Sequence, residues 1–414
     1  MNPVEIGPAP EAERSQSPLD LFLIWAGADI VATTFVVGAS LAGSFDTFTA
    51  LLLIGVGSLA GAAMVASLAP LGPRLGVPSI VAARAALGIR GAGLIAFLMY
   101  VINFAWIAIN NVIAASVCAG FWGGPATERA WAVGLGLLST LVVAGGPRWV
   151  ARTDRLAVPL LFGLSVVMTV ACLRLEPGPL PQPTGSELTL LRGLDVVFGY
   201  QASWILMFAD YSRYTKSERG SLLAVFLGLG LTSAWLMALG YLAARAAQSP
   251  DPAAMLSAAG LGVGGGVLMA FGTLTTNFVN IYLSALAWKS LLPRSSEHVA
   301  LWVTGLVGAL LSLLSRAWLD RFADFMLVLG GVFVPVGGIL IARFFLDRRP
   351  VDVAALYDAR GEHARHLGFS PVGVLAWALG AAVYYTVGAS GGTLPALGVA
   401  LVVYAVASRA FSGS

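Results

Sequence analysis

The polar residues of segment 272–280 (Gly-Thr-Leu-Thr-Thr-Asn-Phe-Val-Asn) have the chemistry of a binding site. They interrupt an apolar run, about 256–292, that is long enough to cross a membrane. Hydrocarbon cannot satisfy hydroxyls and amides, so such residues at this depth must face protein, water or a bound solute. On a helix, Gly272, Thr275 and Thr276 share one side.

The same segment offers two kinds of contact. The hydroxyl oxygens of Thr275 and Thr276, with nearby carbonyls, would form a neutral oxygen cage of the kind that a small hard cation accepts. Asn277 adds an amide that both donates and accepts, which suits a heterocycle. Small polar residues also hold membrane helices together, so the segment by itself leaves the functional and the structural interpretation open.

A second polar group lies in the predicted third span. Asn103, Trp106 and Asn110 are spaced i, i+3 and i+7, which places them in one stripe of one helix. An indole flanked by two amides can stack on a flat ring and bind its edge. A tryptophan packed in a bundle, with asparagines bonded to neighbouring helices, has the same spacing, so this stripe also has two interpretations.

We expect Asp29 to be the only carboxylate well inside the first ten predicted spans, since Asp210 lies at the cytoplasmic end of its helix. A charge at mid-membrane is costly, so this group must be protonated, paired or close to a cation. It is therefore a candidate for a coupling role, either as a proton carrier or as a charge that favours a nearby cation. The alternative is a structural hydrogen bond to interrupted backbone.

The elements that position these residues follow from composition. Of the 414 residues, 58% are hydrophobic and 11% are charged, whereas soluble domains have about 25% charged residues. These values, with a mean hydropathy of +0.84, predict an all-α polytopic membrane protein. Cys118 and Cys172 lie in apolar segments and the three histidines fall in predicted loops, so we expect no disulfide, metal cluster or cofactor.

About twelve segments of roughly 18 residues or more are apolar enough to span a membrane. They divide the chain into a tail at 1–17, a ten-helix core at 18–346, a loop at 347–370 and two accessory helices at 371–410. The predicted spans are 19–43, 47–71, 92–121, 130–146, 156–174, 190–210, 220–247, 257–292, 299–316, 321–346, 371–388 and 391–410.

The distribution of Lys and Arg predicts the orientation of these spans. With twelve spans, eighteen of the 24 basic residues fall on the side of the two termini and six on the other side. Because basic loops remain in the cytoplasm, we expect both termini and the loop at 347–370 to be cytoplasmic. Residues 1–17 lack the basic start and cleavage site of a signal peptide, so we expect a cytoplasmic tail.

The first and sixth spans are both interrupted near mid-membrane. Gly27 and Asp29 interrupt the first span, and Gly199 with the polar side chains after it interrupts the sixth, five helices later. Gly-interrupted segments at matching positions of two halves indicate an inverted five-plus-five repeat with a solute site at the breaks.

Together these features resemble the nucleobase:cation symporter family, which contains cytosine permease and hydantoin permease, over about residues 17–345. The sixth and eighth spans are most similar to the branch associated with hydroxymethylpyrimidine, a thiamine precursor. The resemblance rests on the order and spacing of Trp25-Ala26-Gly27-Ala28-Asp29-Ile30, Leu71-Gly72-Pro73-Arg74-Leu75-Gly76-Val77-Pro78-Ser79, Asn103 with Trp106, Asp210-Tyr211-Ser212-Arg213-Tyr214 and Thr275-Thr276-Asn277.

The resemblance implies a ten-helix inverted-repeat core, two further helices and a sodium site between the first and eighth helices. The implied sodium ligands are the backbone carbonyls of Gly27, Ile30 and Gly272 and the hydroxyls of Thr275 and Thr276. The implied substrate contacts are Val31, Asn103, Trp106, Asn110, Gln201, Ser203, Trp204 and Asn277.

Three positions depart from the family pattern. Gln201 stands where cytosine permease and hydantoin permease have an aromatic residue, and Trp204 comes three residues later. The pattern therefore does not identify the aromatic residue that would stack on the substrate opposite Trp106. The third span has Asn where relatives often have Gln, which suggests that the substrate has a different or slightly larger ring. Asp29 is not among the usual sodium ligands, which leaves room for proton coupling or an additional ion.

The sequence therefore predicts a secondary active transporter, a monomer in the inner (plasma) membrane, that imports a hydroxymethylpyrimidine-like or cytosine-like heterocycle by sodium or proton symport through alternating access. An amino-acid or amine carrier of the same fold, with Asp29 pairing with the ammonium, is the main alternative.

A channel would need a continuous polar lining. An enzyme would need paired carboxylates or a His, Cys and carboxylate constellation, which no span carries. The expected partners are the substrate, the coupling cation and lipid, with no nucleic acid.

Overall fold

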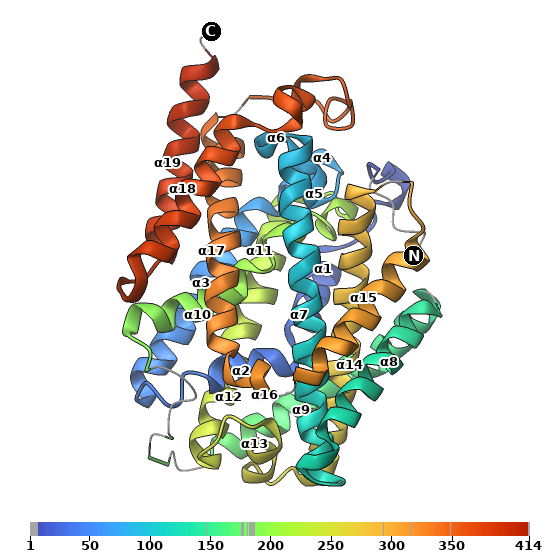
Figure 1. Cartoon of the computed structure of the whole chain (residues 1–414), viewed down its shortest axis with the longest axis vertical. Coiled ribbons are helices and arrows are strands. Elements are labelled where there is room, and N and C mark those ends of the chain that lie inside the picture. The colour runs from blue at the N-terminus through green and yellow to red at the C-terminus, as the bar shows by residue number, and fades with distance from the viewer. Residues whose placement is uncertain are drawn as a thin grey trace.

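The computed structural model is a helical bundle in which most long helices run along one direction (Figure 1). It describes residues 7–145, 147–174, 178–179, 181, 187–292, 294–314, 316–347 and 349–412. Within this described part, seven helices are long and apolar enough to cross a membrane, or eight if the bent pair α1 (Pro18–Asp29) and α2 (Ala32–Ala39) counts as one span. The predicted all-α class is confirmed.

Helices occupy all twelve predicted spans. Four of them, α8, α10, α15 and α18, are 17, 13, 15 and 17 residues long, which is shorter than the about 20 residues of a full membrane crossing. The remaining bounds are α3 (Thr47–Leu68), α4 (Leu71–Leu75), α5 (Ser79–Ala82), α6 (Arg84–Leu87), α7 (Ile89–Phe121), α8 (Glu128–Ala144), α9 (Pro147–Cys172), α10 (Leu190–Ala202), α11 (Glu218–Val225), α12 (Thr232–Ala247), α13 (Pro252–Ala258), α14 (Gly262–Leu291), α15 (Glu297–Leu311), α16 (Arg316–Asp320), α17 (Phe322–Ile341), α18 (Pro371–Val387) and α19 (Thr393–Ser412).

The predicted interruption of the first span is present. The axis bends by 58° between α1 and α2, and the two residues between them, Ile30 and Val31, are both buried. The start of α1 is defined by a capping box, in which the Ser17 side chain accepts from the Asp20 N–H and the Asp20 carboxylate accepts from the Ser17 N–H. No comparable cap precedes α2, which begins inside the bundle.

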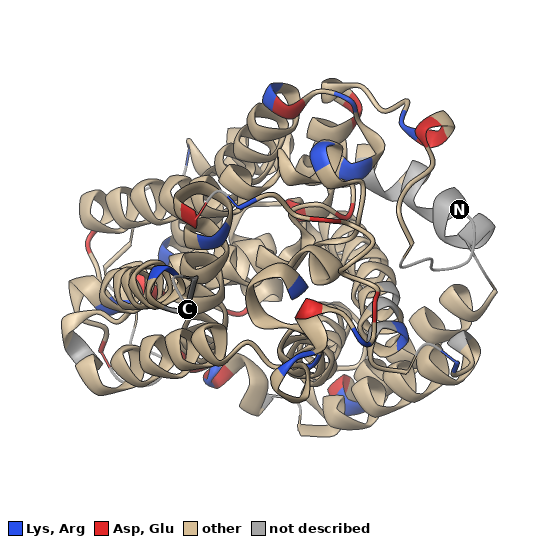
Figure 2. Ribbon diagram, turned by 90° about the horizontal axis from the view of Figure 1, so that it is seen from above, with Lys and Arg blue, Asp and Glu red and all other residues tan. Residues whose placement is uncertain are grey.

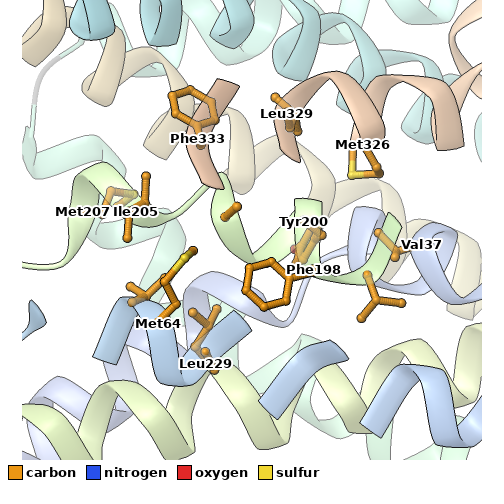
Figure 3. Close-up of a cluster of buried hydrophobic side chains, with 14 of the residues drawn as sticks. Val37, Met64, Phe198, Tyr200, Ile205, Met207, Leu229, Met326, Leu329 and Phe333 are labelled. Carbon is orange, nitrogen blue, oxygen red and sulfur yellow. The ribbon is translucent and has the colours of Figure 1, made fainter. Parts of the chain in front are cut away.

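The sixth span is interrupted as well. The regular α10 ends at Ala202, and the chain continues through short 3₁₀ turns at Ile205–Met207 and Ser212–Tyr214. Figure 3 shows the apolar surroundings of this segment, with Phe198 and Met207 near Met64 of α3 and Phe333 of α17. The interrupted segment is therefore enclosed by other helices, as backbone that leaves its regular hydrogen bonds inside a membrane must be.

Glycines bring α2 and α12 into backbone contact. A Cβ on Gly38 would collide with the carbonyl of Met237, and a Cβ on Gly240 would collide with the carbonyl of Phe35. Small residues of this kind let membrane helices approach closely. The second half of the broken helix is thus held against α12 along its length.

Basic loops gather at one end of the bundle, which is the upper end in Figure 1. Their side chains bond across segments far apart in sequence: Arg14 donates to Pro73 O, Arg84 to Leu356 O and Arg343 to Ala85 O, while Arg74 pairs with Glu218. Figure 2, seen from this end, shows Lys, Arg, Asp and Glu mostly in loops and at helix ends. Residues 1–6, 146, 293, 348, 413 and 414 of this side lie outside the described part.

The accessory helices α18 and α19 pack on α17 and are tied to the core by a buried carboxylate. Asp195 in α10 accepts from the backbone N–H groups of Gly392 (2.7 Å) and Thr393 (3.0 Å) at the start of α19. Asp29 is therefore not the only buried carboxylate of the first ten spans. The carboxylate of Asp195 is buried because the accessory pair covers the start of α10, a contact that local sequence does not reveal.

We expect Gly240→Ala to destabilise the fold, because the added methyl must displace the backbone of Phe35 rather than a flexible side chain. Overpacking of this kind costs about 1–3 kcal/mol or more. The melting temperature of the purified protein in detergent measures the effect. Gly55→Ala in α3 is the matched control, since nothing lies within 4 Å of its new methyl. Equal melting temperatures for the two variants would contradict the backbone contact.

Candidate functional site

A cavity lies where the interrupted first and sixth spans meet α7 and α14. Its free volume is about 30 Å³, which is room for one or two water molecules. The lining comes from four parts of the chain: Val31 and Thr33; Met99, Asn103, Trp106 and Asn110; Tyr200, Ser203, Trp204 and Met207; and Thr276, Asn280 and Leu283. A drug-sized ligand usually occupies a site of several hundred Å³, so side chains must move before a heterocycle can enter.

Trp106 is the central aromatic residue of this cavity. Tyr200 of α10 meets it edge-on, with ring centroids 6.0 Å apart and planes at 80°, and Phe325 of α17 does so at 5.2 Å and 75°. Edge-to-face packing of this type is favourable and fixes the orientation of the indole. The tryptophan is 8% exposed, so a ring that stacks on it must displace a neighbour.

Two buried polar atoms on cavity-lining residues lack hydrogen-bond partners in the described structure. They are the Asn110 side-chain oxygen, an acceptor, and the Trp204 indole N–H, a donor. Leaving such groups unpaired costs about 1–3 kcal/mol each, so a ligand that satisfies them gains affinity. An unpaired acceptor and an unpaired donor on residues that line one cavity are complementary to a ring that carries both N–H and C=O groups.

Two predicted substrate contacts lie outside the cavity lining. Asn277 belongs to an amide network, in which Asn110 donates to Asn277 (3.1 Å) and Asn277 donates to Asn111 (2.7 Å). Gln201 packs its methylenes against Gly61 of α3, and neither of its side-chain polar atoms has a partner in the described part. The contacts of Asn277 are therefore those of the structural interpretation, in which the residue forms hydrogen bonds between helices.

The predicted sodium ligands belong to two parts of the chain, the break between α1 and α2 and the middle of α14. Within α14, the hydroxyls of Thr275 and Thr276 donate to the Gly272 carbonyl at 2.8 and 3.1 Å. These bonds leave the hydroxyl lone pairs available to another partner, and Thr276 lines the cavity together with Val31.

The break itself exposes carbonyl oxygens. Ile30 N–H donates to Ala26 O and Val31 N–H donates to Asp29 O, so the carbonyls of Gly27 and Ile30 stay outside the helical hydrogen-bond ladder. The donor set of neutral carbonyl and hydroxyl oxygens fits the chemistry of a hard monovalent cation.

Asp29 lies behind the cavity and is completely buried. Its carboxylate accepts from the Tyr200 hydroxyl (3.1 Å) and from the Ser233 hydroxyl of α12. The Thr34 hydroxyl donates to the Asp29 carbonyl (2.7 Å) and lies 2.7 Å from the Tyr200 oxygen. This geometry is compatible with both interpretations of Asp29, a coupling role and a structural hydrogen bond to the interrupted backbone. The partners of Asp29 are hydroxyl groups, and none of them is a cation.

Several lining residues were not predicted: Thr33, Met99, Tyr200, Met207, Asn280 and Leu283. Tyr200 had a signal, since it lies between Gly199 and Gln201 in the interrupted sixth span. Asn280 had one too, because it shares a helix side with Thr276. The two methionines and Leu283 are indistinguishable in sequence from ordinary packing residues of a membrane helix.

Comparisons with known proteins agree with this architecture. Residues 8–406 match the family described as permease for cytosine/purines, uracil, thiamine, allantoin. The chain is 24% identical to cytosine permease of Escherichia coli (strain K12) over 383 residues, covering 91% of this chain and 87% of the relative.

Two solved structures of one transporter share the fold. Mhp1, a nucleobase-cation-symport-1 family transporter, superimposes with a TM-score of 0.81 in a closed conformation with bromovinylhydantoin bound, covering 99% of this chain and 95% of Mhp1. The inward-facing conformation of Mhp1 superimposes with a TM-score of 0.85, covering 100% of this chain and 94% of Mhp1. The sequence identity is 20% in both cases.

The family match spans nearly the whole chain. A membrane carrier needs apolar helices and a cavity between interrupted spans, and this chain has both. The predicted resemblance to the family is confirmed, and the hydroxymethylpyrimidine branch stays a prediction. The protein is a multi-pass membrane protein, and it belongs to the nucleobase:cation symporter family, whose members are permeases rather than enzymes.

Proposed function

We propose that this protein imports a flat, polar heterocycle of the pyrimidine type by cation symport. The observation that carries the proposal is the cavity beside Trp106, whose lining includes Asn110, with an unpaired amide oxygen, and Trp204, with an unpaired indole N–H. A ring with adjacent N–H and C=O groups would stack on the indole and satisfy both atoms. Cytosine and hydantoin-like rings carry both groups, and hydroxymethylpyrimidine offers an equivalent donor and acceptor in its amino group and the adjacent ring nitrogen.

The proposed coupling cation is sodium, held by the carbonyls of Gly27, Ile30 and Gly272 and the hydroxyls of Thr275 and Thr276. Support comes from the carbonyls that the helix break leaves outside the ladder and from the orientation of the two hydroxyls. A cation there would hold α14 against the break, and substrate would bind that arrangement better. A coupling free energy of about 1–3 kcal/mol suffices for cation-dependent uptake.

Alternating access is the proposed mode of transport. The cavity is contracted, so the cycle must include a wider state that admits the ring. The interruptions of the first and sixth spans are five helices apart, as an inverted five-plus-five repeat requires. The basic end of the bundle supports cytoplasmic termini in the inner membrane. A monomer is the proposed state of the carrier.

An amine or amino-acid substrate has less support. An ammonium group would need a counter-charge, but the lining residues of the cavity include no carboxylate, and Asp29 lies behind Tyr200 with both oxygens bonded to hydroxyls. A melting-temperature screen of the purified protein against pyrimidines, purines, hydantoins and amines, with and without sodium, tests the choice. Stabilisation by amines but by no heterocycle would overturn the proposal.

Trp204→Phe keeps an aromatic ring and removes only the indole N–H. We expect binding of a carbonyl-bearing heterocycle to weaken about two- to tenfold, because one hydrogen bond contributes about 0.5–1.5 kcal/mol. Titration calorimetry measures the affinity. Trp25→Phe is the matched control, since its N–H is also buried and unpaired in the described structure but lies outside the lining. Equal affinities of the two variants would count against a role for the Trp204 N–H.

Thr275→Ala removes one proposed sodium ligand. We expect the sodium concentration for half-maximal uptake into proteoliposomes to rise about tenfold, with little change in which heterocycle is preferred. Thr273→Ala is the control, because its buried hydroxyl donates to Met269 O (2.7 Å) on the same helix and is not a proposed ligand. An unchanged sodium response in Thr275→Ala would show that the cation binds elsewhere.

A further inference from the structure

A second cavity lies at the basic end of the bundle and shares no lining residue with the cavity beside Trp106. Its free volume is about 480 Å³, which falls within the roughly 300–1,000 Å³ of small-molecule sites. Its walls come from α6 and the turn after it, the segment after α17, the loop that leads to α18, the start of α18 and the end of α19. The loop crosses the upper end of the bundle in Figure 1.

Arginine side chains dominate the charge of this cavity. Arg343, just after α17, is buried and donates to the carbonyls of Ala85 (3.2 Å) and Arg349 (3.0 Å). The Asp347 carboxylate accepts from the Arg349 guanidinium through both oxygens, at 2.7 Å each, and lies 3.8 Å from the Arg343 guanidinium. One carboxylate thus serves two guanidinium groups, which leaves an excess of positive charge on this wall.

The loop adds a guanidinium that is not paired. Arg365 and His366 belong to the lining, and neither side chain has a hydrogen bond or an ion pair within the described residues. Glu362 is the acidic residue of the lining, and it lies 3.2 Å from His363. Burial lowers the pKa of His363, so its imidazole adds little positive charge at neutral pH. Three arginines therefore face two carboxylates, with Asp347 included, and the charge of Arg365 is not compensated.

The backbone directly after Arg365 is strained. His366 (φ 51°) and Leu367 (φ 61°) both adopt the left-handed region, and a glycine follows them. This conformation costs about 1–2 kcal/mol for each residue that carries a Cβ. The end of the turn is fixed to α6, because the Ser370 N–H donates to Leu87 O (2.8 Å). Strained backbone of this kind clusters at ligand sites, and here it keeps Arg365 and His366 beside the cavity.

The type of cation in the lining favours phosphate as the ligand. The lining has three arginines and no lysine. Arginine presents a planar fork of N–H donors that binds phosphate oxygens in pairs, and these charge-assisted hydrogen bonds are stronger than neutral ones. Tyr404 of α19 adds a hydroxyl, and the first turn of α18 adds the positive end of a helix dipole. The volume exceeds that of a bare phosphate, so there is room for the organic part of a phosphate ester.

We propose that this cavity binds a phosphate-bearing anion and that Arg365 is its principal contact. The inference goes beyond the proposed transport of a heterocycle and does not depend on it. The phosphate belongs either to a soluble ester or to the headgroup of an anionic lipid, since Leu375 of α18 and Val406 of α19 are exposed apolar side chains that would place lipid near the cavity. Bound phosphate would join the loop to the segment after α17 and to α19, which share the cavity.

Melting temperatures of the purified full-length protein in a neutral detergent test the soluble source. The probe is glycerol 3-phosphate, and sodium chloride at equal ionic strength is the reference. We expect a saturable rise in melting temperature with the ester, and an apparent Kd at least about tenfold weaker in Arg365→Gln, which loses charge-assisted hydrogen bonds. Arg360→Gln is the matched control, since Arg360 is exposed on the same loop and lies outside the lining. Both variants should fold, because neither side chain has a partner within the described residues.

Native mass spectrometry of the same proteins in mixed micelles tests the lipid source. The probe is phosphatidylglycerol, and phosphatidylcholine, whose headgroup has no net charge, is the reference. Selective retention of phosphatidylglycerol that is lost in Arg365→Gln and kept in Arg360→Gln would identify a lipid headgroup, whereas a response confined to glycerol 3-phosphate would identify a soluble ester.

A response to either probe that depends on Arg365 supports the anion site. Equal behaviour of Arg365→Gln and Arg360→Gln toward both probes would overturn it, and so would stabilisation by chloride equal to that by the ester. Neither result bears on heterocycle binding, which the melting-temperature screen decides separately.

Discussion

Backbone that leaves a helix inside a membrane has no water to satisfy it, and this constraint shapes the centre of the molecule. At Ile30 and Val31 the first span loses its regular hydrogen bonds, and the groups released there must find partners in the protein or in a bound solute. Hydroxyls supply some of them, since Thr34 donates to the carbonyl of Asp29. The carbonyls of Gly27 and Ile30 remain outside the helical ladder, which is why we propose a cation at the break.

The same constraint explains why the site is built from segments far apart in sequence. The end of α10, the start of α2 and the polar stretch of α14 each carry groups that apolar neighbours could not satisfy. They meet around Trp106, where Tyr200 links the cavity on one side to Asp29 on the other. The surrounding helices provide the rigid frame, most visibly where Gly38 and Gly240 let α2 lie against the backbone of α12.

Much of this arrangement could be predicted from residue types. Composition and span lengths identify a polytopic helical protein. Gly27 and Gly199 lie in the last turns of α1 and α10, shortly before the two interruptions. The stripe of Asn103, Trp106 and Asn110 indeed lines the cavity. Asn277 and Gln201 could not be placed in this way, because a polar side chain on a buried helix can face a neighbouring helix as readily as a solute. Asn277 bonds to the amides of α7, and Gln201 lies against Gly61.

The sequence by itself determined the membrane class, the family, the breaks and the level of the site along the helices, because each depends on local hydropathy, glycines or motif spacing. Only the tertiary structure decided which polar groups share partners. Asp29 and Ser233 are 204 residues apart, and Asp195 is bonded across a similar separation to the start of α19. Such pairings depend on how helices are rotated against one another, which packing sets and no local pattern records.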